Sequence, residues 1–391
     1  MGNVRGGHGV LPAAIEAHKA SRSLIVAASD APEAKLIRRA SILQTTHLLE
    51  VCNHLCSGKP LQETQVTEPI PERSLPDLVD VKGQHQARRA MEVAAAGGHH
   101  ILLIGPPGAG KTMLATRLPS ILPQLLESEA IESAAVRSIS TAPLYLTHWR
   151  QRPFRAPHHS ASAVSLVGGG RRPRPGEISL AHNGVLFLDE LPEYERRVLE
   201  GLREPMESGF VTISRALTQV RFPARFQLVA AMNPCPCGWL GDPSGRCTCT
   251  PDQVQRYQAR ISGPMLDRID LHIDVPPLDP SYIFPGSAKA GEQSAAVRLR
   301  VEKATETQII RAGKLNRDLT PGEVDRDCVL STDERELLHK ATDRLKFSAR
   351  AWHRILKTAR TIADLAGEPN IQTQHLGEAI GYRGQGWQLM T

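Results

Sequence analysis

The sequence of 391 residues has no long hydrophobic run and no apolar segment close to its N-terminus. A membrane span needs about 20 apolar residues, whereas the most apolar stretches here, residues 101–105 and 185–188, have the length of a strand. The first residues are polar and rich in glycine, so the apolar region of a secretory signal is missing. We therefore expect a cytoplasmic protein without a membrane partner.

Cysteine is scarce and odd in number, with 7 in the chain, which does not suit a disulfide framework. The clustered cysteines are Cys235, Cys237, Cys247 and Cys249. Thiolates grouped around a glycine-rich turn favour a tetrahedral, structural Zn²⁺ site in a reducing compartment. The Cys-x-Cys spacing is tighter than the usual one, and a loop of reduced cysteines without metal is the alternative.

Acidic residues are absent from residues 133–176 and 208–241. These stretches carry Arg137, Arg150, Arg152, Arg155, Arg171, Arg172, Arg174, Arg215, Arg221 and Arg225. Together with the net charge of +6, they predict sequence-independent contact with DNA phosphates. The candidate contacts are Arg171, Arg172, Arg174 and Arg215. A solvated basic loop balanced by acids elsewhere is the alternative, and the few nearby aromatic residues favour phosphate contact over base stacking.

Four segments differ in pattern along the chain. Residues 1–57 predict a small α/β piece, with a strand at 24–27 and helices at 33–40 and 47–55, which we interpret as the last part of a larger domain. Residues 58–74 contain several prolines and predict a linker.

Residues 75–277 alternate strands, among them 101–104, 185–188 and 228–232, with helical segments, as in a parallel sheet covered by helices. Residues 293–391 are helical in pattern, with a capping box at Ser331 and Glu334.

The strand at 101–104 runs directly into a glycine-rich loop and then a helical pattern. The loop is Gly105-Pro106-Pro107-Gly108-Ala109-Gly110-Lys111-Thr112, a Gly-x4-Gly-Lys-Thr motif. Such a loop directs backbone N–H groups and a helix N-terminus at the phosphates of ATP. We expect Lys111 to reach the β- and γ-phosphates and Thr112 to ligate Mg²⁺. A chance glycine-rich turn would not explain the flanking strand and helix.

Two further strands end in polar residues. The strand at 185–188 is followed by Asp189 and Glu190, which are expected to hold the Mg²⁺ water shell and to orient the attacking water. An acidic pair that merely closes a strand is the alternative. The strand at 228–232 ends in Asn233, which is able to reach between the γ-phosphate and the water, although Asn before Pro is also an ordinary turn.

These elements, in this order, resemble the AAA+ ATPases, in the branch that holds the magnesium-chelatase ATPase subunit and the minichromosome-maintenance helicases. The resemblance is closest at PGEISLAHNGVLFLDE (175–190), FPARFQLVAAMNPCPCG (222–238) and SGPMLDRIDL (262–271). Nearly the whole chain is similar to the magnesium-chelatase-like competence proteins, the ComM/YifB family. The resemblance implies a P-loop three-layer domain, a C-terminal helical lid and a partial N-terminal domain of the Lon protease and ribosomal S5 type.

The same resemblance implies further roles. Arg268 corresponds to the arginine finger that reaches a neighbouring subunit, Arg350 to the second-sensor arginine of the lid, and Asn233 to the first sensor. A surface salt bridge is the alternative for either arginine. The family pattern implies a homo-oligomer, a hexamer, that drives branch migration of single-stranded or branched DNA in natural transformation. An ATPase for metal insertion into a porphyrin and a protein-remodelling switch remain alternatives.

Overall fold

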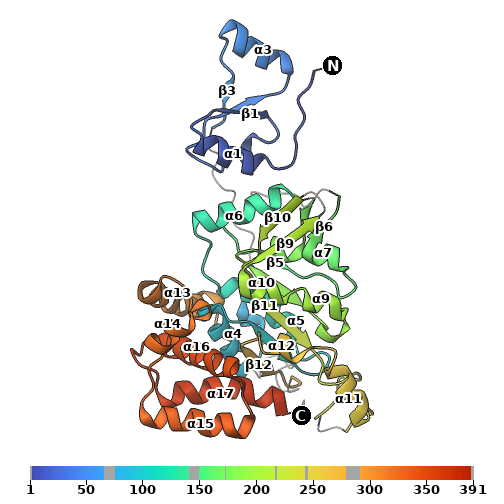
Figure 1. Ribbon diagram of the computed structural model, residues 1–391, viewed down its shortest axis with the longest axis vertical. Helices are drawn as coiled ribbons and strands as arrows, with labels where there is room; N and C mark the ends of the chain where they lie inside the picture. Colours follow the sequence, from blue (N-terminus) through green and yellow to red (C-terminus); the bar gives the residue numbers. More distant parts are fainter. Residues whose placement is uncertain are drawn as a thin grey trace.

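The computed structural model describes residues 2–65, 75–140, 149–171, 173–215, 218–242, 245–278 and 291–388, with the backbone alone at 215, 218 and 384–388. In chain order, Figure 1 shows a small N-terminal unit, a central α/β unit and a C-terminal group of helices. No helix in these ranges combines the length and the apolar character that crossing a membrane requires.

The N-terminal unit is a small sheet with helices around it. Its elements are α1 (Val10–Lys19), β1 (Leu24–Ala27), α2 (Ala31–Ala34), β2 (Ile42–Thr45), α3 (Leu48–Ser57) and β3 (Gln62–Glu63). Leu11 and Ile42 are fully buried in a core that also takes in Ala134, from α6 (Glu127–Ser138) of the central unit. The Gly9 N–H donates to the Ser138 carbonyl at 2.9 Å. The unit therefore completes its core against α6.

The helix expected over residues 33–40 is wrong, because α2 ends at Ala34 and single turns lead to Ala40. The chain has to reverse here in order to enter β2 parallel to β1. Buried Lys35 donates to the Ala40 carbonyl at 3.1 Å, which closes this turn. β3 lies in the segment expected to be a linker, and it pairs antiparallel with β2.

The central sheet has the strand order β12-β4-β11-β8-β5, and every neighbouring pair is parallel. Its strands are β4 (Ile101–Ile104), β5 (Phe154–Arg155), β8 (Val185–Leu188), β11 (Gln227–Met232) and β12 (Leu271–Asp274). All residues of β4, β8 and β11 are buried, as continuous apolar runs predict for a sheet covered on both faces. The predicted strands and the α/β fold class are confirmed.

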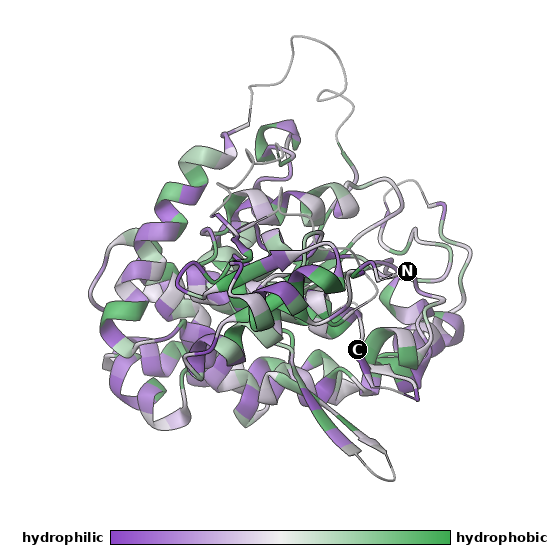
Figure 2. Ribbon diagram, turned by 90° about the horizontal axis from the view of Figure 1, so that it is seen from above, coloured by the Kyte–Doolittle hydropathy of each residue, from purple (hydrophilic) through white to green (hydrophobic). Residues whose placement is uncertain are grey.

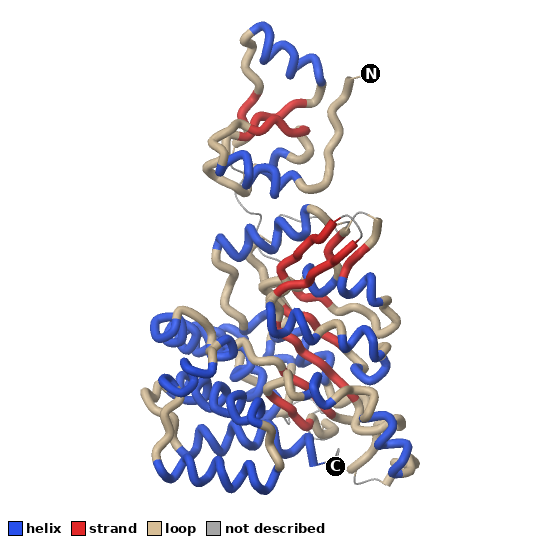
Figure 3. The backbone as a smooth tube through the Cα atoms, in the orientation of Figure 1, coloured by secondary structure: helices blue, strands red, loops and turns tan. Residues whose placement is uncertain are grey.

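Helices lie on both sides of this sheet (Figure 3). Ile101, Leu103 and Val229 belong to one hydrophobic cluster, whereas Leu102 and Leu228 belong to a second. Successive residues thus face opposite layers, as the pleat of a strand requires. The covering elements are η1 (Leu78–Asp80), α4 (His85–Gly97), α5 (Lys111–Ile121), α6, α7 (Ala163–Val167), α8 (Glu177–Leu180), η3 (Leu191–Glu193), α9 (Arg196–Glu200), α10 (Arg203–Ser208), α11 (Pro251–Gln258) and α12 (Gly263–Leu266).

Two hairpins are attached to the central unit. They are β6 (Gly168–Gly169) with β7 (Arg174–Pro175), and β9 (Phe210–Arg215) with β10 (Thr218–Pro223). The second is the hairpin expected in the acid-free stretch 208–241. Figure 2 shows it projecting from the body, while the green, apolar strands of the central sheet lie inside.

The C-terminal helices share a core with the central unit. They are α13 (Ser294–Ala312), α14 (Pro321–Asp327), α15 (Thr332–Leu345), α16 (Ala349–Ala366) and α17 (Thr373–Gln388), with η5 (Asn316–Asp318). The predicted capping box of Ser331 and Glu334 is confirmed at the start of α15. Ile355 and Ile362 of α16 lie in the same hydrophobic cluster as Ile101 of the sheet. The C-terminal helices therefore pack against the central unit and share a hydrophobic core with its sheet.

A buried carboxylate ties this layer to the sheet. Asp270, just before β12, accepts hydrogen bonds from the His100 N–H at 2.8 Å and from Arg354 of α16 at 2.5 Å. Burial by itself raises the pKa of Asp270, but the charges of Arg354 and His99 outweigh it and hold the pKa well below the usual range. The carboxylate therefore stays ionised, and its bond with Arg354 joins the segment that contains Arg268 and Asp270 to α16.

We predict that Asp270→Ala lowers the free energy of unfolding by about 3 to 5 kcal/mol, because it leaves the charge of Arg354 without its buried partner. The depressed pKa means that this stabilisation is present above the unfolded-state pKa of about 3.9 and is lost only at lower pH. Urea unfolding at pH 7 and at a pH below about 3.9 measures both effects. Glu336→Ala, which breaks the exposed pair with Lys340, is the control and should change stability little. Equal losses in the two variants would contradict the prediction.

Candidate functional site

The carboxyl ends of β4, β8 and β11 meet at one edge of the sheet. Ile104 is paired with Met232, and β8 runs parallel to β11 beside it. The residues that follow these strands, Gly105, Asp189 and Asn233, are therefore delivered to the same edge. In open parallel sheets this edge is where ligands bind.

Glycines shape the loop between β4 and α5. A Cβ on Gly105 would lie 2.2 Å from the Val275 carbonyl oxygen, so only glycine permits the close approach of the chain after β12. Gly108 and Gly110 have φ angles of +77° and +90°, and no described atom lies within 4 Å of a Cβ built on either. The space beside Gly108 and Gly110 is thus open before the N-terminus of α5, a position that favours an anion.

Lys111 lies at the base of this loop, with its ammonium group mostly buried. It donates to the carbonyls of Gly105 at 2.6 Å and Pro106 at 2.9 Å, and to the Asn233 side-chain oxygen at 3.1 Å. Burial lowers the pKa of Lys111, while the charges of Asp189 and Glu190 oppose the shift. The cation is therefore held at the loop by neutral acceptors, and a phosphate would supply its missing counter-charge.

The carboxylates after β8 face the start of α5. The Thr112 hydroxyl donates to Asp189 Oδ2 at 2.8 Å, and the other oxygen of Asp189 accepts from the Glu190 N–H at 2.9 Å. A hydroxyl and a carboxylate oxygen in contact are a donor set that fits Mg²⁺ beside a phosphate. The sequence prediction of this pairing is consistent with the geometry.

Glu190 is engaged by a histidine. His159 Nδ1 lies 2.9 Å from Glu190 Oε2, and Glu190 has a left-handed backbone with φ of +53°. The histidine belongs to the loop after β5, which is held in place by the Tyr194 hydroxyl donating to the Pro157 carbonyl at 2.6 Å. In this conformation one carboxylate oxygen of Glu190 is engaged by the imidazole of His159.

The two arginines implied by the family resemblance form a separate group. Arg268 is buried, contacts Glu207 at 2.5 Å and donates to the Pro264 carbonyl at 2.7 Å. Burial is the main cause that lowers the pKa of Arg268, and the charge of Arg350 adds to it. Arg350 is exposed at the start of α16. Among the described residues, the contacts of Arg268 are thus with Glu207 and Pro264, while Lys111, Thr112, Asp189 and Asn233 are joined to one another.

The four clustered cysteines converge. The Sγ atoms of Cys235, Cys237, Cys247 and Cys249 all lie within 4.8 Å of one another. Cys235 Sγ is 3.3 Å from Cys237 Sγ and 3.8 Å from Cys247 Sγ, and the last two atoms are 3.6 Å apart. A tetrahedral zinc with bonds of about 2.3 Å separates its sulfurs by about 3.8 Å, so this donor set fits the ion.

Several arginines of the acid-free stretches have structural partners. Arg155 makes a two-pronged ion pair with Glu177 at 2.6 and 2.7 Å, and Arg152 donates to the carbonyls of Pro123 and Asn183. These two guanidinium groups are therefore engaged within the protein, and Arg155 is balanced by an acidic residue outside the acid-free stretch. Arg171 and Arg174 are exposed around the turn of β6 and β7. Arg172 and the side chain of Arg215 lie outside the described residues.

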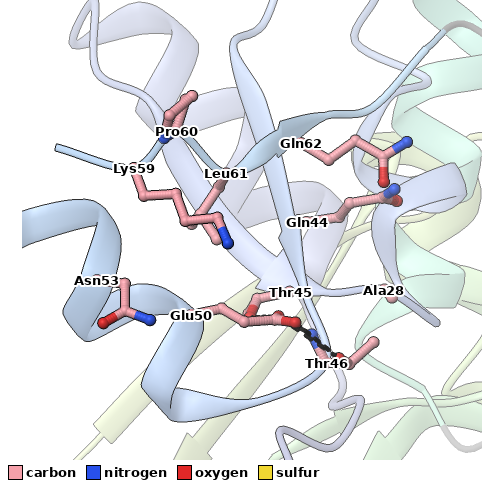
Figure 4. A pocket seen from close by; sticks show the side chains of 10 residues that line it. All are labelled: Ala28, Gln44, Thr45, Thr46, Glu50, Asn53, Lys59, Pro60, Leu61 and Gln62. Atoms are coloured by element: carbon pink, nitrogen blue, oxygen red, sulfur yellow. Dashed lines mark hydrogen bonds between the residues drawn. The ribbon is translucent and has the colours of Figure 1, made fainter. Parts of the chain in front are cut away.

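A shallow pocket of about 250 Å³ lies apart from this site, between β2, α3 and β3 of the N-terminal unit (Figure 4). Its carboxylate, Glu50, accepts from the Thr45 hydroxyl at 2.7 Å and from the Thr46 N–H at 2.9 Å. The Thr45 hydroxyl and the backbone donors lower the pKa of Glu50 to about 2. Glu50 is therefore the third helical residue of the capping box that begins α3, with His47 at the N-cap.

Sequence reasoning missed the role of His159 and the contact partners of Arg268. His159 lies in the acid-free stretch 133–176, where residue type and spacing predict no specific contact for it. His159 follows β5 and Glu190 follows β8, and these strands are about 30 residues apart in the chain. No short-range sequence pattern therefore indicates that the two side chains meet. The single available signal was the adjacent pair His158 and His159.

Comparisons with known proteins agree with this geometry. Residues 77–283 match the family model of magnesium chelatase, subunit ChlI, and residues 291–383 match that of its C-terminal part. The chain is 50% identical to "Competence protein ComM" of Haemophilus influenzae, over 98% of this chain and 75% of that protein. It is 49% identical to "Uncharacterized protein YifB" of Salmonella typhimurium, with the same coverage.

A more distant relative is the "Magnesium-chelatase 38 kDa subunit" of Cereibacter sphaeroides, 26% identical over 39% of this chain and 51% of that protein. The resemblance noted in the sequence is thereby confirmed. With its five-stranded parallel sheet, its phosphate loop and the carboxylates after β8, the chain belongs to the ComM/YifB family of magnesium-chelatase-like AAA+ proteins.

Proposed function

We propose that this protein is an ATP-hydrolysing ring motor that moves on single-stranded or branched DNA. The observation that carries the proposal is the cluster of Lys111, Thr112, Asp189, Glu190 and Asn233 at one sheet edge. The relative named competence protein ComM supports a role in DNA uptake or recombination.

The cluster supplies what phosphoryl transfer to water requires. Lys111 and the N-terminus of α5 would bind the phosphates, and Thr112 with Asp189 would hold Mg²⁺, which neutralises phosphate charge when bound. Glu190 would orient the water and accept its proton as the bond to the γ-phosphorus forms. The bond to the β-phosphate oxygen breaks, and ADP and phosphate leave.

His159 connects hydrolysis to the first acid-free stretch. In the structure it contacts the same carboxylate that would orient the water, from a loop that is followed by α7 and the β6–β7 hairpin. DNA bound to that hairpin would pull on this loop and release Glu190. The contact is thus suited to restrain hydrolysis in the absence of DNA.

The separate position of Arg268 and Arg350 supports assembly into a ring. An arginine that stabilises the transferred phosphate from the neighbouring subunit contributes about 10³ to 10⁵ in rate. Arg268 is held by Glu207 and by the Pro264 carbonyl, and no described hydrogen bond or ion pair joins it to Lys111 or Asp189. A ring, with six subunits as the family pattern implies, would place Arg268 and Arg350 at the next subunit's phosphates once Arg268 leaves Glu207.

The two hairpins form the proposed DNA surface. Gly168 of β6 lies against Ile213 of β9, with a Cβ position 3.0 Å from Ile213 Cδ1, so the hairpins are neighbours. They carry the exposed Arg171, Arg174 and Arg221. Figure 1 shows β6, β9 and β10 together at one end of the central unit, where a ring would line its channel with them.

The cysteine cluster would hold a structural Zn²⁺. Its four sulfurs would close the coordination sphere, so the ion would have no open position for catalysis. The cluster spans the loop between β11 and α11 and would fold that loop.

We predict that His159→Ala raises the DNA-free ATPase rate by up to about tenfold, because loss of a charge-assisted hydrogen bond frees Glu190. Stimulation by DNA should shrink by the same factor. Steady-state phosphate release with and without forked DNA measures both. His158→Ala, beside it on the same loop, is the control. A lower basal rate in His159→Ala alone would show that His159 assists Glu190 instead.

The steady-state ATPase rate with forked or four-way-junction DNA tests the proposed function. We expect strong stimulation, which Glu190→Gln should reduce by about 10²-fold or more. Arg171→Ala combined with Arg174→Ala should weaken DNA binding and lower its salt dependence by about one unit per lost phosphate contact. The basal rate should persist, and Arg335→Ala with Arg344→Ala on α15 is the matched control. Hydrolysis indifferent to DNA would instead favour a metal-insertion or protein-remodelling partner.

Elemental analysis of the purified protein should find about one zinc per chain. Changing both Cys247 and Cys249 to Ser should remove the metal, whereas the same change at the exposed Cys52 and Cys56 should not. Far less than one zinc in the unchanged protein would refute the site.

A further inference from the structure

The cysteine cluster lies directly against the phosphate loop. Gly238, which follows Cys237, is buried, with a φ of +83°. A Cβ at this position would lie 2.6 Å from Pro107 Cδ and 2.8 Å from Pro107 Cγ. Pro107 belongs to the phosphate loop. The backbone of the cysteine loop therefore packs directly against the phosphate loop at Pro107, and there is no room for a side chain between them.

The same loop begins at the polar side chain that holds Lys111. Asn233 accepts a hydrogen bond from Lys111, and Cys235 follows it by two residues. A Cβ on Gly238 would also lie 3.7 Å from the Asn233 side-chain carbon. Asn233 is therefore linked to Cys235 over two residues of chain and lies beside Gly238 in space, so a movement of either would reach the partner of Lys111.

The other end of the loop returns to the same place. Thr250 follows Cys249 and caps α11, with its hydroxyl accepting from the Gln253 N–H. Near the end of α11, Gln258 donates to the Pro234 carbonyl at 3.1 Å, and the Asn233 backbone hydrogen-bonds the Tyr257 hydroxyl. The two ends of the segment from Asn233 to Gln258 are therefore in contact. One arm of this segment carries Cys235 and Cys237, the other carries Cys247 and Cys249, and the arms meet at the four sulfurs.

We propose that metal in the cysteine cluster is a brace for the nucleotide site: by joining the two arms it presses Gly238 onto Pro107 and holds Asn233 at Lys111. The inference rests on the zinc site proposed above and extends it, because a structural ion that only folded a distant loop would leave nucleotide affinity unchanged. Without the ion, no bond joins Cys235 and Cys237 to Cys247 and Cys249, so the two arms are free to separate. The phosphate loop then loses its contact with Gly238.

The coupling is reciprocal. If bound metal raises the affinity for nucleotide, bound nucleotide must raise the affinity for metal by the same factor. Nucleotide should therefore slow the loss of zinc to a chelator. This readout does not depend on hydrolysis or on DNA.

A pair of glycine substitutions tests the contact. Gly238 and Gly241 lie in the same loop with φ angles of +83° and +80°, but no described atom lies within 4 Å of a Cβ on Gly241. Both changes to alanine impose similar backbone strain, and only Gly238→Ala pushes on Pro107. We expect Gly238→Ala to bind a fluorescent ADP analogue at least about fivefold more weakly while it retains zinc. Gly241→Ala should match the unchanged protein in both measurements.

Metal removal tests the brace itself in the unaltered chain. Treatment with 1,10-phenanthroline should lower the affinity for the ADP analogue, and added Zn²⁺ should restore it. The rate of zinc release should fall when ADP is present. Unchanged affinity after zinc removal, or equal affinity in the two glycine variants, would overturn the coupling while leaving the zinc site intact. Protein isolated with far less than one zinc per chain would overturn both.

Discussion

Parallel pairing of β4, β8 and β11 is the constraint on which the functional site depends. Three buried strands in one register bring the residues that follow them to a single edge, although these residues are far apart in the chain. Lys111, Asp189 and Asn233 meet there because the backbone ladder leaves them no other position. The apolar side chains that bury the strands on both faces therefore also determine the spacing of the polar groups.

Everything else at that edge is added by loops. The loop after β5 contributes His159, whose imidazole contacts the Glu190 carboxylate. The loop after β11 contributes the cysteine cluster and Gly238, which packs on Pro107. Both loops approach the phosphate-binding residues from outside the sheet. One of these loops lies in an acid-free stretch and the other carries the clustered cysteines. These two features of the chain therefore contact the residues that are expected to bind and hydrolyse the nucleotide.

The C-terminal helices are joined to the same centre through buried charge. Asp270 links the segment of Arg268 to α16, whose first turn carries Arg350. A displacement of α16 would therefore move both arginines together, because a buried ion pair is costly to separate. In the proposed ring, this coupled movement would let one subunit respond to the nucleotide of the next.

The sequence alone determined β1, β4, β8 and β11 and the positions of the phosphate loop, the carboxylates after β8 and the clustered cysteines, because each is a local run of characteristic residue types and spacing. It failed over residues 33–40, where the path into β2 overrides helical propensity, and it overestimated the free arginines, since Arg152 and Arg155 have partners that are distant in the chain. The contacts of His159 with Glu190, Asp270 with Arg354, and Gly238 with Pro107 were decided by tertiary structure alone. Each joins segments whose approach depends on how loops and helices pack around the sheet, and such packing leaves no short-range pattern in the chain.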